Sequence, residues 1–385
     1  MTTSLTLDTR AVRAGLENCD VTGAVVPPLH LSSTYAFRSF GDKRKYDYSR
    51  SGNPTRDLLG EALSDLEGGT GAVITGSGMG AITLVGHILP VGARIVVPHD
   101  CYGGTFRLFT AWKKRGELDV EFVDFGDDAA VSAAFAKPAA LVWIETPSNP
   151  LLRITDIVDI TKRAHAAGAL VAADNTFLSP GWQRPIALGV DIVVHSTTKY
   201  INGHSDVVGG AVIAATRELA EQLAWWGNCL GLTGGAFDSY LTLRGLRTLH
   251  VRLREHGRNA QAVAEFLSKQ PGIKRVLFPG LASHPGHEIA QRQQSGFGAI
   301  VTIEVEGGLD GAKRFSEALE LFSLAESLGG VESLIAHPGT MTHAAMAPEA
   351  RAAAGLVDGL LRLSIGIEST EDLLRDLQAG VRAIS

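Results

Sequence analysis

The chain has 385 residues, of which 45% are hydrophobic and 20% charged, a composition typical of a globular protein large enough for two domains. Its net charge of -6, without a dense block of lysine and arginine, argues against a nucleic acid or an acidic membrane as partner. No apolar run approaches the ~20 residues of a membrane-spanning helix, and we expect no secretory signal in the stretch MTTSLTLDTR. The three cysteines are far apart in the sequence, so we expect a cytoplasmic protein.

The first 55 residues are irregular and rich in proline and polar residues, as in VVPPLHLSSTYAF and KYDYSRSGNPTRD. We interpret them as an arm rather than as a packed unit. The stretch RDLLGEALSDLEGG follows. It places leucine and alanine on one helical face and ends in glycines, and therefore predicts a helix.

Six short apolar segments then alternate with helical patterns or turns and are predicted to be strands. They are GAVIT (71–75), ARIVVP (93–98), DVEFVD (119–124), AALVWIE (139–145), ALVAAD (169–174) and DIVVHS (191–196). Because they do not alternate between apolar and polar residues, they suit a sheet that is covered on both faces. Repeated strand–helix units predict an α/β fold with a mainly parallel sheet and right-handed crossovers.

A second, smaller α/β domain is predicted near the C-terminus. A long helical pattern covers about 237–269 and ends at Pro271-Gly272. It is followed by further helices and by the strand-like segments IKRVLF, GAIVTIEV and LFSLA. We therefore expect an arm over 1–55, a large domain over 56–256 and a C-terminal α/β domain over 257–385, with the boundary inside the long helix.

Polar residues stand where several of these strands end, which is where open α/β sheets bind their ligands. The first strand leads into a glycine loop, Gly76–Gly80, that opens a helix and could bind phosphate. Asp174 ends a purely apolar strand, and a buried carboxylate needs a partner. Lys199 follows the sixth strand, and a desolvated lysine amine has a lowered pKa and becomes a nucleophile.

Other interpretations of these residues remain open at this point. Gly76, Gly78 and Ala81, with Asp100 about 20 residues later, fit a loose dinucleotide fingerprint and would indicate a dehydrogenase. Against it, the loop begins after some seventy residues, and a dehydrogenase does not need Lys199. A tight turn, a turn-capping aspartate and a lysine that extends to solvent are the structural alternatives. The pair His284 and His287 lacks neighbouring ligands, so we expect a loop there and no metal site.

Taken together, the residues at the strand ends suit pyridoxal 5'-phosphate. This cofactor needs an amine for its aldehyde, a carboxylate for its ring nitrogen, phosphate donors and a flat partner for its ring. Each part is available from Lys199, Asp174, the glycine loop with Ser196 and Thr198, and Tyr102.

The stretch HSTTKYINGHSDVVGG resembles the lysine motif of the Cys/Met-metabolism family of pyridoxal-phosphate enzymes. The resemblance extends over nearly the whole chain through PPLHLSSTYAF, YDYSRSGNPTR, HDCYGGTFRLF, ETPSNPLL, DNTFLSP, AESLGGVESL, MTHAAMAPEAR and LRLSIGIE. It implies fold type I, with a mainly parallel sheet in the large domain and a smaller C-terminal α/β domain. It also implies a homo-oligomer, a tetramer built from dimers, that acts on amino acids in the cytoplasm.

The family resemblance implies a role for each matching residue. The catalytic residues would be Lys199, which holds the cofactor as a Schiff base, and Tyr102, which stacks on its ring. Asp174 would contact the ring nitrogen of the cofactor, and Asn149 its 3′ oxygen. The phosphate would be bound by Gly78, Met79, Ser196 and Thr198. Tyr48 and Arg50 would bind the cofactor phosphate of a neighbouring subunit. The substrate would be bound by Arg362, Ser327 and Asn149 near its carboxylate and by Glu326, Asp47 and Arg107 at its distal part. Without the resemblance, Tyr48, Arg50, Glu326 and Arg362 would be interpreted as surface, helix-end or salt-bridge residues.

Within the family, the sequence favours replacement at the γ-carbon of an O-acylated L-homoserine by L-cysteine, which makes cystathionine. Gly104 stands where methionine-cleaving members have cysteine, and Glu326-Ser327-Leu328 stands where common β-cleaving bacterial members have bulky aromatic residues. The segments CYGG and HAAMAPEAR favour the synthetic reaction. The alternatives are cleavage of cystathionine at its γ-carbon and a replacement reaction that uses sulfide instead of cysteine. The sequence does not distinguish a succinyl from an acetyl group on the homoserine.

Overall fold

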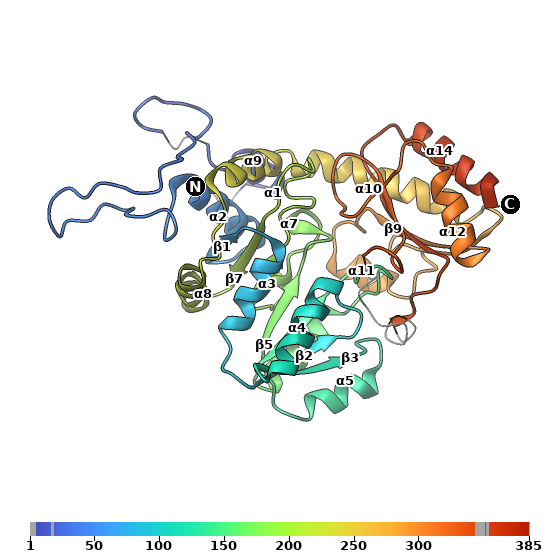
Figure 1. The fold of residues 1–385 in the computed structure, drawn as a ribbon, viewed down its shortest axis with the longest axis horizontal. Helices are drawn as coiled ribbons and strands as arrows, with labels where there is room; N and C mark the ends of the chain where they lie inside the picture. The colour runs from blue at the N-terminus through green and yellow to red at the C-terminus, as the bar shows by residue number, and fades with distance from the viewer. Residues whose placement is uncertain (1–4, 17–18, 343–350, 352–353, 385) are drawn as a thin grey trace.

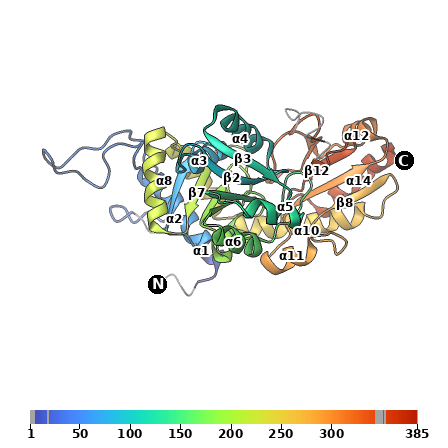
Figure 2. The same ribbon diagram turned by 90° about the horizontal axis from the view of Figure 1, so that it is seen from below.

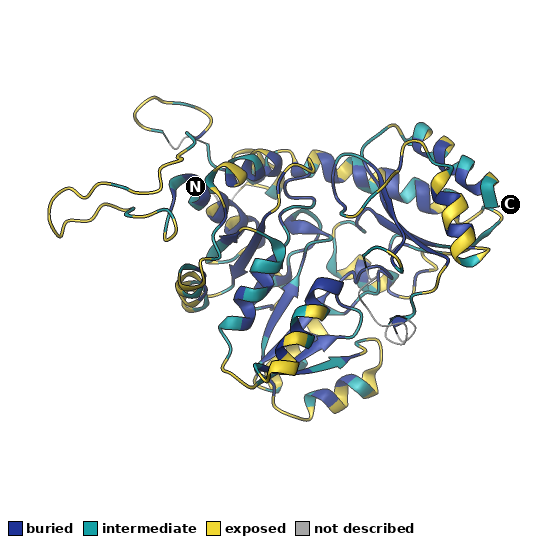
Figure 3. Cartoon of the chain, viewed as in Figure 1, coloured by how far each residue is buried: buried dark blue, intermediate teal, exposed yellow. Residues whose placement is uncertain are grey.

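The structure is a computed structural model and describes residues 5–16, 19–342, 351 and 354–384. A short helix, α1 (Leu7–Val12), precedes an arm that leaves the body of the molecule and returns at Asn53, the N-cap of the next helix (Figure 1). Most of the arm is exposed, and its tip is an irregular hairpin with a bridge between Thr34 and Tyr48 (Figure 3). Near its return to the body, the arm contacts its own chain through Arg50, which bonds Asn228.

The large sheet has seven strands in the order β1-β7-β6-β5-β4-β2-β3. Its strands are β1 (Gly71–Thr75), β2 (Ala93–Pro98), β3 (Leu118–Val123), β4 (Leu141–Glu145), β5 (Leu170–Asp174), β6 (Ile192–His195) and β7 (Gly210–Ala214). All six predicted strands are present, and the predicted mainly parallel sheet is confirmed. The unpredicted strand β7 is antiparallel to both of its neighbours, β1 and β6.

Helices cover both faces of the large sheet. The helices around it are α2 (Pro54–Glu67), α3 (Gly78–His87), α4 (Gly103–Arg115), α5 (Asp128–Phe135), α6 (Ile157–Ala166), α7 (Ser179–Trp182), the 3-10 turn Pro185–Leu188 and α8 (Arg217–Leu230). One core forms beneath α2, α5 and α6, and a second forms beneath α3, α4 and α8. Buried strands with apolar side chains on both faces explain why the sequence shows no alternation.

The helical pattern over 237–269 is two helices, α9 (Ala236–Leu246) and α10 (Leu249–Leu267), rather than one. The carbonyl of Gly245 accepts from the Thr248 amide and from the Arg252 side chain instead of continuing the helical ladder. This side-chain competition ends α9, and it was not visible in the apolar periodicity. Helix α10 then runs from the large sheet to the second sheet (Figure 2).

The second sheet has five strands in the order β10-β11-β12-β9-β8. Its strands are β8 (Ile273–Leu277), β9 (Ile300–Val305), β10 (Ser323–Leu324), β11 (Leu334–Ala336) and β12 (Leu360–Ser364). Its helices are α11 (His287–Gln293), α12 (Gly308–Glu317) and α14 (Thr370–Ile384). Among the described residues, no helix combines the length and the apolar character of a membrane-spanning segment.

Candidate active site

A cavity of about 280 Å³ lies at the carboxyl ends of β1, β4, β5 and β6, beside the segment that follows β10. Its wall brings together many of the residues predicted from the sequence: Gly78, Met79, Tyr102, Asn149, Asp174, Ser196, Thr198, Lys199, Glu326, Ser327 and Arg362. These residues come from both sheets and from segments almost 300 positions apart. The predicted position of the site, beyond the strand ends, is therefore where the cavity forms.

Lys199 is the amine of this cavity. It follows β6 after three residues, and its Nζ donates to Ser327 Oγ at 2.7 Å. Burial, together with the neighbouring Arg362 guanidinium, lowers the pKa of the Lys199 amine from 10.5 to about 8. Roughly a tenth of the amine is therefore uncharged and nucleophilic at pH 7, far more than for an ordinary lysine.

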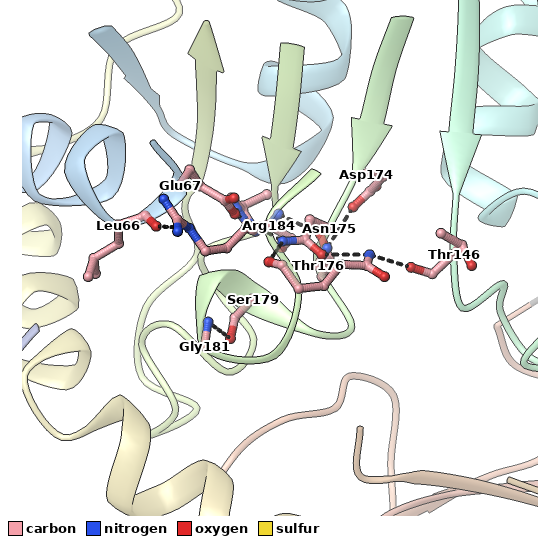
Figure 4. Close-up of polar contacts among 12 residues, drawn as sticks. Leu66, Glu67, Thr146, Asp174, Asn175, Thr176, Ser179, Gly181 and Arg184 are labelled. Carbon is pink, nitrogen blue, oxygen red and sulfur yellow. Dashed lines mark hydrogen bonds and ion pairs between the residues drawn. The ribbon is translucent and has the colours of Figure 1, made fainter. Parts of the chain in front are cut away.

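Two carboxylates stand side by side on the floor of the cavity. Asp174 and Glu145 are in register at the ends of β5 and β4, and both line the wall. Burial raises the pKa of both groups, and the Asp174 charge raises the pKa of Glu145 further. Asp174 accepts from the Thr176 amide at 3.0 Å (Figure 4), whereas Glu145 accepts from the Tyr102 amide at 2.8 Å. Each carboxylate therefore makes it harder for the other to ionise.

The glycine loop forms the N-terminus of α3 against the β6 end. Ser77 caps the helix by accepting from the Gly80 amide at 3.0 Å. A Cβ at residue 78 would lie 2.7 Å from the Ser196 Cβ, so only glycine permits this close approach. Backbone amides at a helix N-terminus, next to the Ser196 hydroxyl, form a cradle for an anionic group. Thr198 lies beside them, although its hydroxyl already bonds the Gly209 backbone at 3.0 Å and 3.2 Å.

Arg362 is a buried guanidinium with an open position. Its two terminal nitrogens donate to the Ser327 carbonyl at 2.7 Å and to Asn149 Oδ1 at 3.2 Å. Among the residues that the structure describes, Nε of Arg362 has no hydrogen-bond partner. Ser327 has a φ of 85°, a left-handed conformation that is uncommon outside glycine. Arg362 thus stabilises an unusual turn and still offers a donor to an anion.

Tyr102 provides an exposed aromatic ring at the mouth of the cavity. Tyr102 is 38% exposed and stands directly before α4. Burial of part of the side chain raises its pKa, and Arg107 on the next helical turn opposes that rise. Arg107 is near Tyr102 but does not line the cavity.

The three arm residues predicted for the site are not in this chain's own cavity. Asp47 bonds Lys43, Ser51 and the Tyr48 amide within the arm. Arg50 donates to the backbone carbonyl and side-chain oxygen of Asn228 on α8, both at 2.9 Å. Tyr48 and Arg50 are both exposed or nearly so, on a segment that projects from the body.

Several lining residues were missed in the sequence. They are Ile82, Glu145, Pro147, Thr176, Phe177, Val208, Leu328 and Thr342, whereas Ser77 belongs to the predicted glycine loop. Glu145 could have been found, because it ends the apolar strand LVWIE just as Asp174 ends its own. Thr176 had no such signal. The segment 343–350 of the motif MTHAAMAPEAR lies outside the described residues.

The dinucleotide alternative fails on topology. In the dinucleotide fold the second strand lies next to the first, whereas here β1 and β2 are separated in the sheet by β7, β6, β5 and β4. Asp100 instead pairs with Arg153 at 3.4 Å. His284 is buried and accepts from the Gly286 amide within its own loop. The described part of the chain contains no group of three or more side chains suited to a metal ion.

Comparison with known proteins identifies the type of enzyme that has this site. The family model described as "Cys/Met metabolism PLP-dependent enzyme" matches residues 8–382. A cystathionine gamma-synthase from Escherichia coli strain K12 is 57% identical over 376 residues, with 97% of each chain covered. A cystathionine gamma-lyase from Dictyostelium discoideum is 46% identical over 372 residues, with 96% of each chain covered.

A solved structure gives the same result for the fold. The cystathionine gamma synthase from Xanthomonas oryzae pv. oryzae, in complex with aminoacrylate and cysteine, is 60% identical to this chain. The two structures superpose with a TM-score of 0.98, and 99% of this chain and 98% of the other are covered. The same Xanthomonas enzyme has also been solved in complex with cystathionine.

Proposed function

Because the chain belongs to the Cys/Met metabolism PLP-dependent enzyme family, we propose that it is a cystathionine γ-synthase, which joins L-cysteine to an O-acyl-L-homoserine. The observation that carries this proposal is the contact between Lys199 and Ser327, with Arg362 holding the carbonyl of that same serine. An amine and a carboxylate-binding guanidinium therefore lie on either side of one residue. An α-amino acid bound by Arg362 would present its α-carbon to Lys199.

The residues of the cavity fit pyridoxal phosphate. A lysine with a lowered pKa suits its aldehyde, and the buried Asp174 suits a protonated ring nitrogen. The glycine cradle with Ser196 suits its phosphate, and Tyr102 suits the face of its ring. Thr198 and Met79 would complete the phosphate site, and Asn149 would contact the 3′ oxygen. When bound, the cofactor withdraws electrons from the carbon atoms of the amino acid attached to it.

The chain's own residues would orient the amino acid and move its protons. Arg362 would fix the α-carboxylate through parallel hydrogen bonds, together with Asn149 and Ser327. Lys199 Nζ, with a pKa of about 8, can accept the proton of the α-carbon and return it at neutral pH. Ser327 Oγ, already 2.7 Å from this amine, would hold it in place between proton transfers.

The distal part of the substrate would meet charged groups at the mouth of the cavity. Glu326 lines the wall, and Arg107 lies on the turn of α4 after Tyr102. Asp47, Tyr48 and Arg50 would reach a site only in a second copy of the chain, because they lie outside their own cavity. We propose a homo-oligomer, a dimer of dimers, in which the arm completes a neighbouring site.

Cleavage of cystathionine at the γ-carbon is the second candidate, since a γ-lyase relative is 46% identical. Gly104 argues against cleavage of methionine: a Cβ there would lie 2.5 Å from the Tyr102 ring and 2.7 Å from Met79 Sδ. The cysteine found at this position in methionine-cleaving members would not fit without displacing the ring.

Product analysis tests the proposal. The purified protein, loaded with cofactor, is incubated with O-succinyl- or O-acetyl-L-homoserine, with and without L-cysteine. We expect cystathionine to be the main product with cysteine present, and 2-oxobutanoate to form only slowly. If cystathionine is instead cleaved faster than it is made, the γ-lyase assignment replaces the synthase assignment.

A further inference from the structure

A pair of fully buried, ionisable side chains lies on the opposite face of the large sheet from the cavity. Glu67 is the last residue of α2 and His195 the last residue of β6, and both are 0% exposed. Along β6, Val193 packs in the core beneath α2 and Val194 in the core beneath α3. Because side chains alternate along a strand, His195 points with Val193 toward α2.

The two side chains of the pair are in direct contact. His195 Nε2 lies 2.6 Å from Glu67 Oε1, and Asn175 Nδ2 donates to the same oxygen at 2.9 Å (Figure 4). An oxygen that receives two donors at short distance suits an ionised carboxylate. A buried carboxylate is stabilised by a cation beside it, and a protonated His195 would supply that cation. The nearby Arg184 instead donates its Nε to the Leu66 carbonyl.

This arrangement is costly for the fold. An acidic side chain at the C-terminus of a helix faces the negative end of the helix dipole. Within the described residues, Glu67 Oε2 and His195 Nδ1 have no hydrogen-bond partner. Apolar side chains of similar size would fill the space without these costs. The costs point to a role for the charge itself.

Asp174 is the group on which this charge acts. Strands β5 and β6 are neighbours, and Asp174 is in register with Val194, the residue before His195. A positive charge on His195 would oppose the rise in the pKa of Asp174 that burial causes. Glu145 of β4 and Cys101 after β2 face Asp174 from the other side, and burial raises the pKa of both. Neither of these two supplies a positive charge.

We propose that Glu67 and His195 are positioning residues that maintain a positive charge behind Asp174, so that the proton between Asp174 and the cofactor's ring nitrogen stays on the nitrogen. This inference rests on the proposed function, because it requires the ring nitrogen to face Asp174. A cation on His195 would lie closer to Asp174 than to a ring bound in the cavity. It therefore stabilises the carboxylate more than it opposes the proton on the nitrogen.

The test observes the ring nitrogen directly. The wild-type protein and a His195→Gln variant are loaded with pyridoxal phosphate carrying an isotope-labelled ring nitrogen and compared by nitrogen NMR. Glutamine can still donate to Glu67 but carries no charge. We expect a protonated nitrogen in the wild type and a shift toward the unprotonated signal in the variant. We also expect kcat to fall on the order of tenfold, with KM nearly unchanged, because the loss of one neighbouring charge typically changes a proton affinity by about one unit.

A second variant and a matched control separate charge from packing. Glu67→Gln should move the nitrogen signal in the same direction, because His195 loses the anion that keeps it protonated. If His195→Gln does not fold, the Glu67→Gln variant decides the question. Gln183 belongs to the same buried network, where it donates to the Thr146 carbonyl and to Asn175. Gln183→Met should lower stability but leave the signal unchanged.

The outcomes distinguish this inference from the proposed function. A wild-type signal in both His195→Gln and Glu67→Gln would overturn the inference. A wild-type chain that takes up no pyridoxal phosphate would instead overturn the proposed function.

Discussion

The amine of Lys199 lies 2.7 Å from the hydroxyl of Ser327, and this contact joins the end of the large sheet to the second sheet. Lys199 follows β6, while Ser327 follows β10 in a left-handed conformation with a φ of 85°. Arg362 of β12 holds the Ser327 carbonyl. The position of the amine therefore depends on both sheets and on the buried arginine between them.

Substitution of Arg362 by lysine should reduce turnover and weaken amino-acid binding. Lysine keeps the positive charge but cannot donate two parallel hydrogen bonds, so the substrate carboxylate loses its direction. We expect kcat/KM to fall by about 10²-fold, as misplacement of reacting groups typically costs. Steady-state kinetics with an O-acyl-L-homoserine measures the change.

Arg252 is a matched control for this substitution. Burial lowers the pKa of both guanidiniums to about 10, but Arg252 donates to the carbonyls of Tyr200, Ile201 and Gly245 instead of facing the cavity. Arg252→Lys should lower the free energy of unfolding by about 2 kcal/mol, through lost hydrogen bonds, and change KM little. Wild-type kinetics for Arg362→Lys would show that its assigned role is wrong.

Substitution of Gly104 by alanine should displace the Tyr102 ring. The added Cβ would lie 2.5 Å from Tyr102 Cε1, so the ring must leave its present rotamer. We expect pyridoxal-phosphate affinity to fall roughly five- to tenfold, because a strained side-chain torsion costs on the order of 1 kcal/mol. Gly60→Ala on α2 is the control, since its Cβ would meet neighbours at 3.5 Å or more. Equal affinities of the two variants would contradict the close packing at Tyr102.

Covalent uptake of the cofactor should depend on pH through the Lys199 amine. Only the uncharged amine attacks an aldehyde, and burial with Arg362 nearby lowers its pKa to about 8. The rate of uptake by the cofactor-free protein should therefore rise with pH and level off above pH 8. Arg362→Gln removes a positive charge and should move this profile to higher pH. A wild-type rate that keeps rising toward pH 10, as for an ordinary lysine, would be inconsistent with the lowered pKa.

Mixed oligomers test whether the arm completes a neighbouring site. Arg50→Ala and Lys199→Ala each inactivate the protein if each site combines one chain's arm with another chain's lysine. Co-expression of the two should restore up to about a quarter of the wild-type activity, because half of the sites in each hybrid dimer are intact. Lys199→Ala with Asp174→Ala, which alter the same cavity, should restore none. Absence of recovery in the first mixture would indicate that the arm serves its own chain.

The sequence predicted the parts of the molecule that depend on local patterns. The six large-sheet strands follow from short apolar runs, and the position of Lys199 and Asp174 follows from where those runs end. Strand β7 (Gly210–Ala214) was missed although it is the same kind of short apolar run, and its antiparallel pairing with β1 and β6 was not visible in the sequence. Pairing of this kind depends on tertiary contacts and leaves no period in the sequence.

The site was less predictable where contacts cross the fold. The Lys199–Ser327 contact spans 128 positions, and the break between α9 and α10 depends on the Arg252 side chain. The pairing of Glu67 with His195 also spans 128 positions and joins residues that look unrelated in the sequence. Roles that came from the family resemblance, such as those of the arm, depend on a second copy of the chain and stay predictions.

Chemical labelling tests the central claim most directly, namely that Lys199 holds the cofactor. The purified protein, loaded with pyridoxal phosphate, is reduced with borohydride, digested and mapped by mass spectrometry. We expect the pyridoxyl group on Lys199 alone, and none in the Lys199→Ala variant treated in the same way. A label on another lysine, or an equal label in the variant, would contradict the account of the cavity given above.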